Sequence, residues 1–215
     1  MAGEELNASA LVNRTIALLR SCPVPTALYV LGIGGLDLLT DIADSSFAFG
    51  MMLAGIFGSY LLTRSILSAA GFQVQEKYVI GAFFGVGFLS GLGILFGFLF
   101  LIIPGVILWV RWLPAYGILV AEETSAIEAL NASWQRTYGN FWPLFAASAV
   151  YAAFLLFAVL IYGSPDIFPE VPRMLALVVG NFLVGLSGAI GVAFGIASYL
   201  LLGPQGPDGL EQVFA

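Results

Sequence analysis

A nearly uninterrupted apolar run from residue 79 to residue 121 restricts the fold of this chain more than any other feature, and its one charged side chain is Arg111. A membrane-spanning helix needs about 20 apolar residues. The run is therefore long enough for two spans and too long for one. Because Pro104 and Gly105 interrupt it, we predict a tight reversal within the sequence IIPG, residues 102–105.

The composition extends this argument to the whole chain of 215 residues. It is 60% hydrophobic and 9% charged, whereas a soluble domain carries about 25% charged residues. A soluble globule of this length could not hide so much apolar surface. We therefore predict an all-α fold, a polytopic integral membrane protein, with residues 1–215 forming one membrane domain.

The apolar segments divide this domain into six predicted transmembrane helices and two interfacial amphipathic helices. Spans one to four occupy residues 25–121, and spans five and six occupy residues 140–202. The predicted spans are 25–41, 47–71, 79–102, 105–121, 140–162 and 173–202. The interfacial helices are predicted at 4–21 and 124–138, and residues 203–215 form a frayed tail.

Each interfacial helix has a local pattern. In residues 4–21, the apolar positions Leu6, Leu11, Ile16 and Leu19 are assigned to one helix face at the membrane surface. An ordinary leader to the first span is the alternative interpretation. In residues 124–138, Ser125 precedes Glu128 by three residues, which is the spacing of a capping box. If this helix spanned the bilayer, its polar residues would be buried without partners. We therefore expect it to lie along the membrane surface.

Glycine is frequent, with 26 residues, and several glycines are four residues apart. This spacing lets helix backbones approach closely in a membrane. We expect packing inside one subunit rather than a dedicated dimer face. The pairs are Gly81/Gly85, Gly87/Gly91, Gly93/Gly97 and Gly191/Gly195.

The distribution of basic residues predicts the orientation. With the N-terminus inside, most Arg and Lys residues lie on the cytoplasmic side, and Arg173 alone lies opposite. Both termini are then cytoplasmic. The acidic start does not have the pattern of a secretory signal, so we expect the first span to direct insertion. The residues placed inside are Arg14, Arg20, Arg64, Lys77 and Arg136.

Charge and residue types also exclude several function classes. A formal charge of −6 argues against nucleic-acid partners. With no histidine and a single cysteine, Cys22, the chain cannot form an intramolecular disulfide and lacks the usual ligands of zinc and haem. We expect no cofactor and no metal. Glu122 and Glu123 are adjacent and diverge on a helix, so no catalytic residue is predicted.

Arg111 is the polar residue that the predicted spans explain least, because a charge at the bilayer centre costs about 2.5–3.5 kcal/mol on insertion scales. Three interpretations remain open. It pairs with Asp37 at a matched depth, or it reaches outer lipid phosphates while Trp109 and Trp112 join the aromatic belt, or it lines a substrate or ion path. Pro114 loosens the following turn and provides a nearby acceptor.

Two further groups of charged residues have a predicted arrangement. Asp37, Asp41 and Asp44 fall on one face of the first span because of their helical spacing. Arg64 is expected near Glu122 and Glu123 at the inner end of the spans. Solvated charges without specific pairing are the favoured interpretation there.

Residues 102–145 carry a more specific pattern, in which a Pro-Gly turn, an arginine, a proline and an acidic residue precede the helix motif EAL-x-x-S-W-x-x-T-x-G-x-x-W. The matching positions are Pro104, Gly105, Arg111, Pro114, Glu122, Glu128, Ala129, Leu130, Ser133, Trp134, Thr137, Gly139 and Trp142. The pattern resembles the membrane domain attached to some bacterial glycerophosphodiester phosphodiesterases and the YciC-type inner-membrane proteins. The resemblance implies a six-span domain of the bacterial inner membrane. It does not imply the phosphodiesterase reaction, which belongs to a separate soluble barrel.

These observations predict a non-enzymatic integral inner-membrane protein with an accessory, anchoring or lipid- and envelope-homeostasis role. The expected partners are membrane lipids, with another membrane protein or a second copy of the chain as alternatives. A small transporter or channel with a polar path near Arg111 and Asp37 is the competing hypothesis. A membrane-embedded lipid enzyme is disfavoured by the missing catalytic site.

Overall fold

The computed structural model describes residues 7–43, 48–74 and 80–203, which form helices and connecting turns with no strand among them. Its helices are α1 Ala8–Ser21, α2 Pro23–Ala43, α3 Ala48–Ala69, α4 Ile80–Phe100, α5 Ile102–Arg111, α6 Ala115–Glu122, α7 Ala126–Arg136, α8 Phe141–Tyr162, α9 Ser164–Ile167 and α10 Arg173–Leu202. The all-α fold class is confirmed. Leu6, Asp44, Lys77 and nearly all of the predicted tail, residues 204–215, lie outside the described residues.

Six helical segments of the described chain are long and apolar enough to cross a membrane, which confirms the polytopic six-span prediction. They are Pro23–Ala43, Gly50–Ala69, Ile80–Phe100, Ile102–Glu122, Phe141–Tyr162 and Arg173–Leu202. The fourth comprises both α5 and α6. The remaining helices α1, α7 and α9 are too short to span a bilayer.

The reversal between the third and fourth spans lies at Leu101, not within residues 102–105 as predicted. Leu101 has extended backbone angles between α4 and α5. Pro104 therefore lies in the first turn of α5. A proline is tolerated there because the N–H groups of the first helical turn have no partner within the helix.

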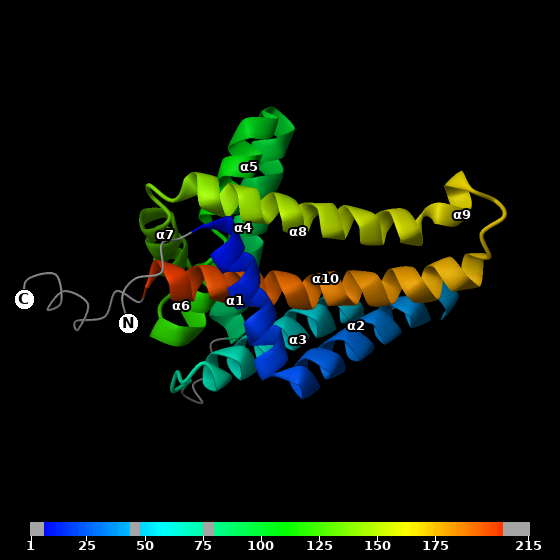
Figure 1. The fold of residues 1–215 in the computed structure, drawn as a ribbon, viewed down its shortest axis with the longest axis horizontal. Helices are drawn as coiled ribbons and strands as arrows, with labels where there is room; N and C mark the ends of the chain where they lie inside the picture. The colour runs from blue at the N-terminus through cyan, green and yellow to red at the C-terminus, as the bar shows by residue number, and fades with distance from the viewer. Residues whose placement is uncertain (1–6, 44–47, 75–79, 204–215) are drawn as a thin grey trace, which may run out of the picture.

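Helix α10 runs through the middle of the molecule and contacts α1, α2, α3, α6 and α8. Figure 1 shows α8 and α2 running beside α10, while the hairpin of α4 and α5 stands across them. Helix α1 crosses over α10 at the end of the molecule where α7 lies. The hairpin therefore meets the other helices over a limited area near its base.

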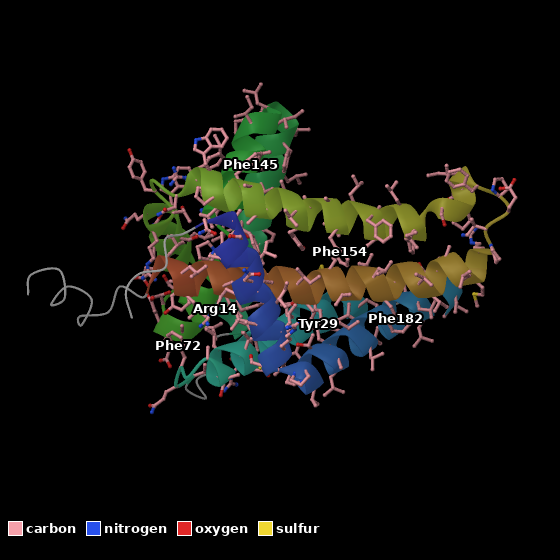
Figure 2. The ribbon with its side chains drawn as sticks, in the orientation of Figure 1. Arg14, Tyr29, Phe72, Phe145, Phe154 and Phe182 are labelled. Carbon is pink, nitrogen blue, oxygen red and sulfur yellow. The ribbon has the colours of Figure 1, made fainter. Side chains whose placement is uncertain are left out.

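Small residues allow the closest helix contacts. A Cβ atom built on Gly97 would lie 2.7 Å from the Cα of Gly105, so α4 and α5 touch backbone to backbone. A Cβ on Gly34 would lie 2.9 Å from the ring of Phe182, and Figure 2 shows Phe182 between α10 and α2. The predicted packing inside one chain thus holds at these contacts. Gly81 and Gly91, in contrast, face open space.

The predicted apolar face of the first amphipathic helix is partly wrong. Leu11 and Leu18 are buried, but Ile16 is 42% exposed. The buried positions follow the three- and four-residue spacing of Leu11, Thr15 and Leu18, whereas the step from Leu11 to Ile16 is five residues. Leu11 belongs to a core cluster with residues of α5, α8 and α10. This face of α1 therefore packs on the protein itself.

Candidate functional site

The fourth span bends immediately after Arg111. Helix α5 ends there, residues 112–114 form a turn, and Pro114 begins α6 as its N-cap. The N–H of Ala115 donates to the carbonyl of Trp112 at 3.2 Å, and Pro114 has no N–H to donate. The turn thus leaves the carbonyl of Arg111 without its usual helical partner.

Helix α7 supplies the missing donors. The Ser133 hydroxyl donates to the Arg111 carbonyl oxygen at 2.7 Å. The Thr137 hydroxyl lies 3.4 Å from the same oxygen and 2.8 Å from the carbonyl oxygen of Ser133. Ser133 and Thr137 are fully buried. These motif residues therefore attach α7 to the bend in the fourth span.

The guanidinium of Arg111 is held by the same helix. Its Nη1 donates to the carbonyl oxygen of Trp134 over 3.4 Å. Its central carbon lies 5.1 Å from the ring centroid of Trp134 and 5.5 Å from that of Tyr138. Aromatic faces attract a cation at these distances. Arg111 is therefore held by α7 and the residues that follow it, although its buried Nε has no hydrogen-bond partner among the described residues.

Of the three interpretations left open for Arg111, the structure does not contain the pair with Asp37. No ion pair joins these residues within the described chain, where the salt bridge is between Arg136 and Glu122. The pairing equated depth along α5 with depth along α2, but the α4–α5 hairpin stands across α2 (Figure 1), so the two depths do not correspond. Arg111 lies beside α7, whereas α2 ends at the opposite end of the molecule, near α9 (Figure 1).

A different acidic residue of α2 forms the specific contacts. The carboxylate of Asp41 accepts hydrogen bonds from Asn181 Nδ2 at 2.8 Å and from the Tyr162 hydroxyl at 3.0 Å. These bonds join α2, α10 and the end of α8. Neither Asn181 nor Tyr162 is among the residues predicted from the sequence. An amide inside the apolar span 173–202 is the signal that could have identified Asn181.

Glu122 pairs with Arg136 rather than with Arg64. The two guanidinium nitrogens of Arg136 lie 2.6 Å from the two carboxylate oxygens of Glu122, with the Arg136 side chain 5% exposed. Arg136 also lies over the ring of Tyr199, whereas Arg64 lies over Tyr60. Gly139, with φ +82°, turns the chain from α7 towards α8. This end of the molecule is thus a fixed junction of α6, α7 and α10.

A cavity of about 780 Å³ lies between the α4–α5 hairpin and helices α2, α3, α8 and α10. This volume is in the range of about 300–1,000 Å³ that is typical of ligand pockets. Most of its wall is apolar, and none of the described residues that line it is charged. The polar lining residues all carry hydroxyl groups: Tyr29, Ser59, Thr63, Ser90, Tyr116 and Tyr151.

Glycines make room for the tyrosines of this wall. Cβ atoms built on Gly188, Gly87 and Gly191 would each lie 2.8 Å from a tyrosine hydroxyl oxygen, those of Tyr29, Tyr116 and Tyr151 respectively. Every one of these glycines also lines the cavity. Larger residues would displace the tyrosine rings, so the glycines set the shape of the cavity.

Trp109 and Trp112 line this cavity, rather than the aromatic belt of the interpretation in which Arg111 reaches lipid phosphates. The ring of Trp112 packs against Gly93 of α4, and Trp109 lies beside the ring of Tyr151. The face of α5 that carries them is turned towards α4 and α8. The tryptophans therefore belong to the interior of the helix assembly.

The rim of the cavity is apolar. Met52 of α3 and Phe84 and Phe88 of α4 line the cavity and are 48%, 44% and 56% exposed. Helices α3 and α4 each contain a segment long and apolar enough to cross a membrane.

No family model matches this chain, and neither a curated protein nor a solved structure is significantly similar to it. The resemblance carried by residues 102–145 therefore stays a prediction. In the described part of the chain, no cluster of three His, Cys, Asp or Glu side chains could hold a metal ion. The chemistry that the arrangement offers is hydrogen bonding from hydroxyls inside an apolar cavity.

Proposed function

We propose that this multi-pass membrane protein is a non-enzymatic lipid-binding protein, and that the cavity beneath the α4–α5 hairpin is its ligand site. The observation that carries the proposal is an uncharged cavity whose exposed rim consists of Met52, Phe84 and Phe88. A ligand that enters through such a rim comes from the bilayer. It is therefore a lipid or another hydrophobic molecule.

The same geometry disfavours a charged substrate. A charge inside the cavity would lose its hydration without gaining an opposite charge, which is strongly unfavourable. Arg111 and Asp37, the residues on which the transporter hypothesis rested, do not line the cavity. The transporter with a polar path near these two residues thus has no support from this arrangement.

For the cellular setting, we propose the bacterial inner membrane, with both termini in the cytoplasm and a role in lipid or envelope homeostasis. The resemblance and the distribution of arginines support this assignment. Figure 1 agrees with this assignment, since the beginning of α1, the end of α10 and α7 lie towards one end of the molecule and α9 at the other. Arg173 begins α10 at the α9 end.

The test is to fill the cavity without disturbing the helices. Gly55 lines the cavity, and a Cβ atom there meets nothing within 4 Å. Gly32 has equally open space but does not line the cavity. We expect Gly55→Leu to reduce the lipid retained by the purified protein in native mass spectrometry, and Gly32→Leu to retain the wild-type amount. Equal lipid retention in both variants would refute the cavity as the ligand site.

A further inference from the structure

The polar groups of the cavity indicate which class of lipid it selects, an inference that rests on the proposed function. We propose that the cavity binds an uncharged lipid with a hydroxyl-bearing head, such as a diacylglycerol, through Tyr29 and Ser59, in preference to anionic phospholipids. These two residues come from α2 and α3 and line one side of the cavity.

The number of donors and acceptors on Tyr29 and Ser59 supports this selection. The hydroxyls of Tyr29 and Ser59 lie 3.2 Å apart, and either can be the donor. One hydrogen bond between two hydroxyl groups uses one of their two hydrogens. The second hydrogen is left to donate towards a ligand, and the oxygen lone pairs are left to accept.

Thr63 lies one helical turn further along α3, but it is 1% exposed, and its hydroxyl donates to the carbonyl oxygen of Ser59 at 2.7 Å. It therefore supports the wall and does not contact the ligand. Tyr29 and Ser59 together offer both a donor and an acceptor, which is what a ligand hydroxyl needs.

Charge discriminates between lipid classes. A phosphodiester carries a permanent negative charge that needs a cation or several strong donors when it leaves water. No arginine or lysine is among the described residues that line the cavity. A lipid hydroxyl or ester carbonyl, in contrast, is satisfied by neutral hydroxyl groups. The apolar remainder of the wall, including Phe84, Phe88 and Ile94, then packs against acyl chains.

The experiment compares two photoreactive probes in the full-length protein in nanodiscs. One is a diacylglycerol with a diazirine in an acyl chain, and the other is phosphatidylglycerol with the same chains. Mass spectrometry of the cross-linked peptides locates the labels. We expect diacylglycerol to label the peptides that contain Met52 and Phe84 several-fold more strongly than phosphatidylglycerol does.

Variants then test the hydroxyl groups themselves. Tyr29→Phe and Ser59→Ala each remove one hydroxyl, and we expect each to lower diacylglycerol labelling roughly three- to tenfold, as the loss of one hydrogen bond does. Tyr60→Phe is the matched control. Tyr60 is 2% exposed, and its buried hydroxyl has no hydrogen-bond partner and does not line the cavity. Labelling of this variant should equal that of the wild type.

The outcomes separate the two proposals. If phosphatidylglycerol labels the cavity peptides as strongly as diacylglycerol, the proposed ligand class is overturned while lipid binding stands. Unchanged labelling in both Tyr29→Phe and Ser59→Ala overturns the role of the hydroxyl groups. If neither probe labels the cavity peptides, the lipid-binding function fails as well. Thermal unfolding of each variant, measured in parallel, shows whether a loss of labelling reflects a loss of folding.

Discussion

The hydroxyl of Ser133 donates a hydrogen bond to the carbonyl oxygen of Arg111, 22 positions earlier in the chain, at 2.7 Å. This bond joins the bend of the fourth span to α7. Ser133→Ala would leave this carbonyl with only the longer hydrogen bond from the Thr137 hydroxyl, at 3.4 Å, so the cost is about 1 kcal/mol, the lower end of the range for an unsatisfied buried group. We expect a corresponding decrease in the free energy of unfolding, measured by denaturation in detergent micelles.

Ser148→Ala is the control for this prediction. Ser148 is also fully buried, but its hydroxyl donates to Leu144 within its own helix. That carbonyl oxygen keeps its place in the backbone ladder of α8. We therefore expect a smaller loss of stability. A loss equal to that of Ser133→Ala would show that the bond between α7 and the bend is not specifically important.

Arg111 should be coupled energetically to Trp134 and independent of Asp37. The guanidinium lies over the Trp134 ring at 5.1 Å, and such contacts contribute about 0.5–2 kcal/mol. A double-mutant cycle of Arg111→Gln and Trp134→Leu should give an interaction energy in this range. The cycle of Arg111→Gln with Asp37→Asn should be additive. Coupling in the second cycle would restore the pair that the structure excludes.

Glu122→Gln should be among the most damaging single changes. It leaves the guanidinium of Arg136, whose side chain is 5% exposed, without its counter-charge. Breaking a buried ion pair by removing one partner costs about 3–5 kcal/mol. The exposed neighbour Glu123 provides the control, and Glu123→Gln should leave the unfolding temperature nearly unchanged. If the two variants have similar stability, the ion pair does not hold α6 to α7.

The capping box of α7 predicts a dependence of stability on pH. The Ser125 backbone N–H donates to Glu128, and together with the Ser125 hydroxyl it holds the pKa of Glu128 below its ordinary value. A group with a lowered folded-state pKa stabilises the fold above its unfolded pKa of about 4.3. That contribution is lost as the pH falls through the folded-state value.

Thermal unfolding between neutral and acidic pH measures this contribution. In Glu128→Gln the titrating carboxyl is absent, so its stability should depend less on pH than that of the wild type. NMR titration of Glu128 in the wild type gives the pKa directly. A pKa at or above that of an unfolded glutamate would contradict the prediction.

The membrane topology is tested with single cysteines introduced after Cys22 is replaced. Residues Gly71 and Gly139 are expected on the cytoplasmic side, and Pro169 on the opposite side. An impermeant thiol reagent applied to intact cells should therefore label a cysteine at 169 and not those at 71 or 139. Labelling at 169 only after the membrane is broken would refute the proposed orientation.

The number of spans could be predicted from the sequence because it depends on the length of apolar segments alone. The capping box of Ser125 and Glu128 was predictable for a similar reason, since its partners are three residues apart. The bend after Arg111 could not be predicted from the sequence, although Pro114 is a local signal for it. Its geometry depends on the hydroxyls of Ser133 and Thr137, which reach the bend from another helix.

The cavity could not be predicted because it arises where distant segments meet. Gly188 of α10 gives space to the hydroxyl of Tyr29 in α2, and neither residue indicates the other in the sequence. The glycine spacing predicted close packing, but not which side chain each glycine would face. The position of Trp109 and Trp112 stayed open between alternatives for the same reason, since only the assembled helices show where these side chains lie.

Helix α10 has a consequence for biosynthesis. The ribosome makes it after α1–α9, and yet it contacts α1, α2, α3, α6, α8 and α9 and supplies Gly188, Gly191 and Gly195 to the cavity. Until it is inserted, the grooves of α2 and α8 that receive it are open to lipid, and Asp41 lacks Asn181. The inserted helices of the nascent chain are therefore loosely associated until α10 joins them. Membrane quality control can recognise the chain during that interval.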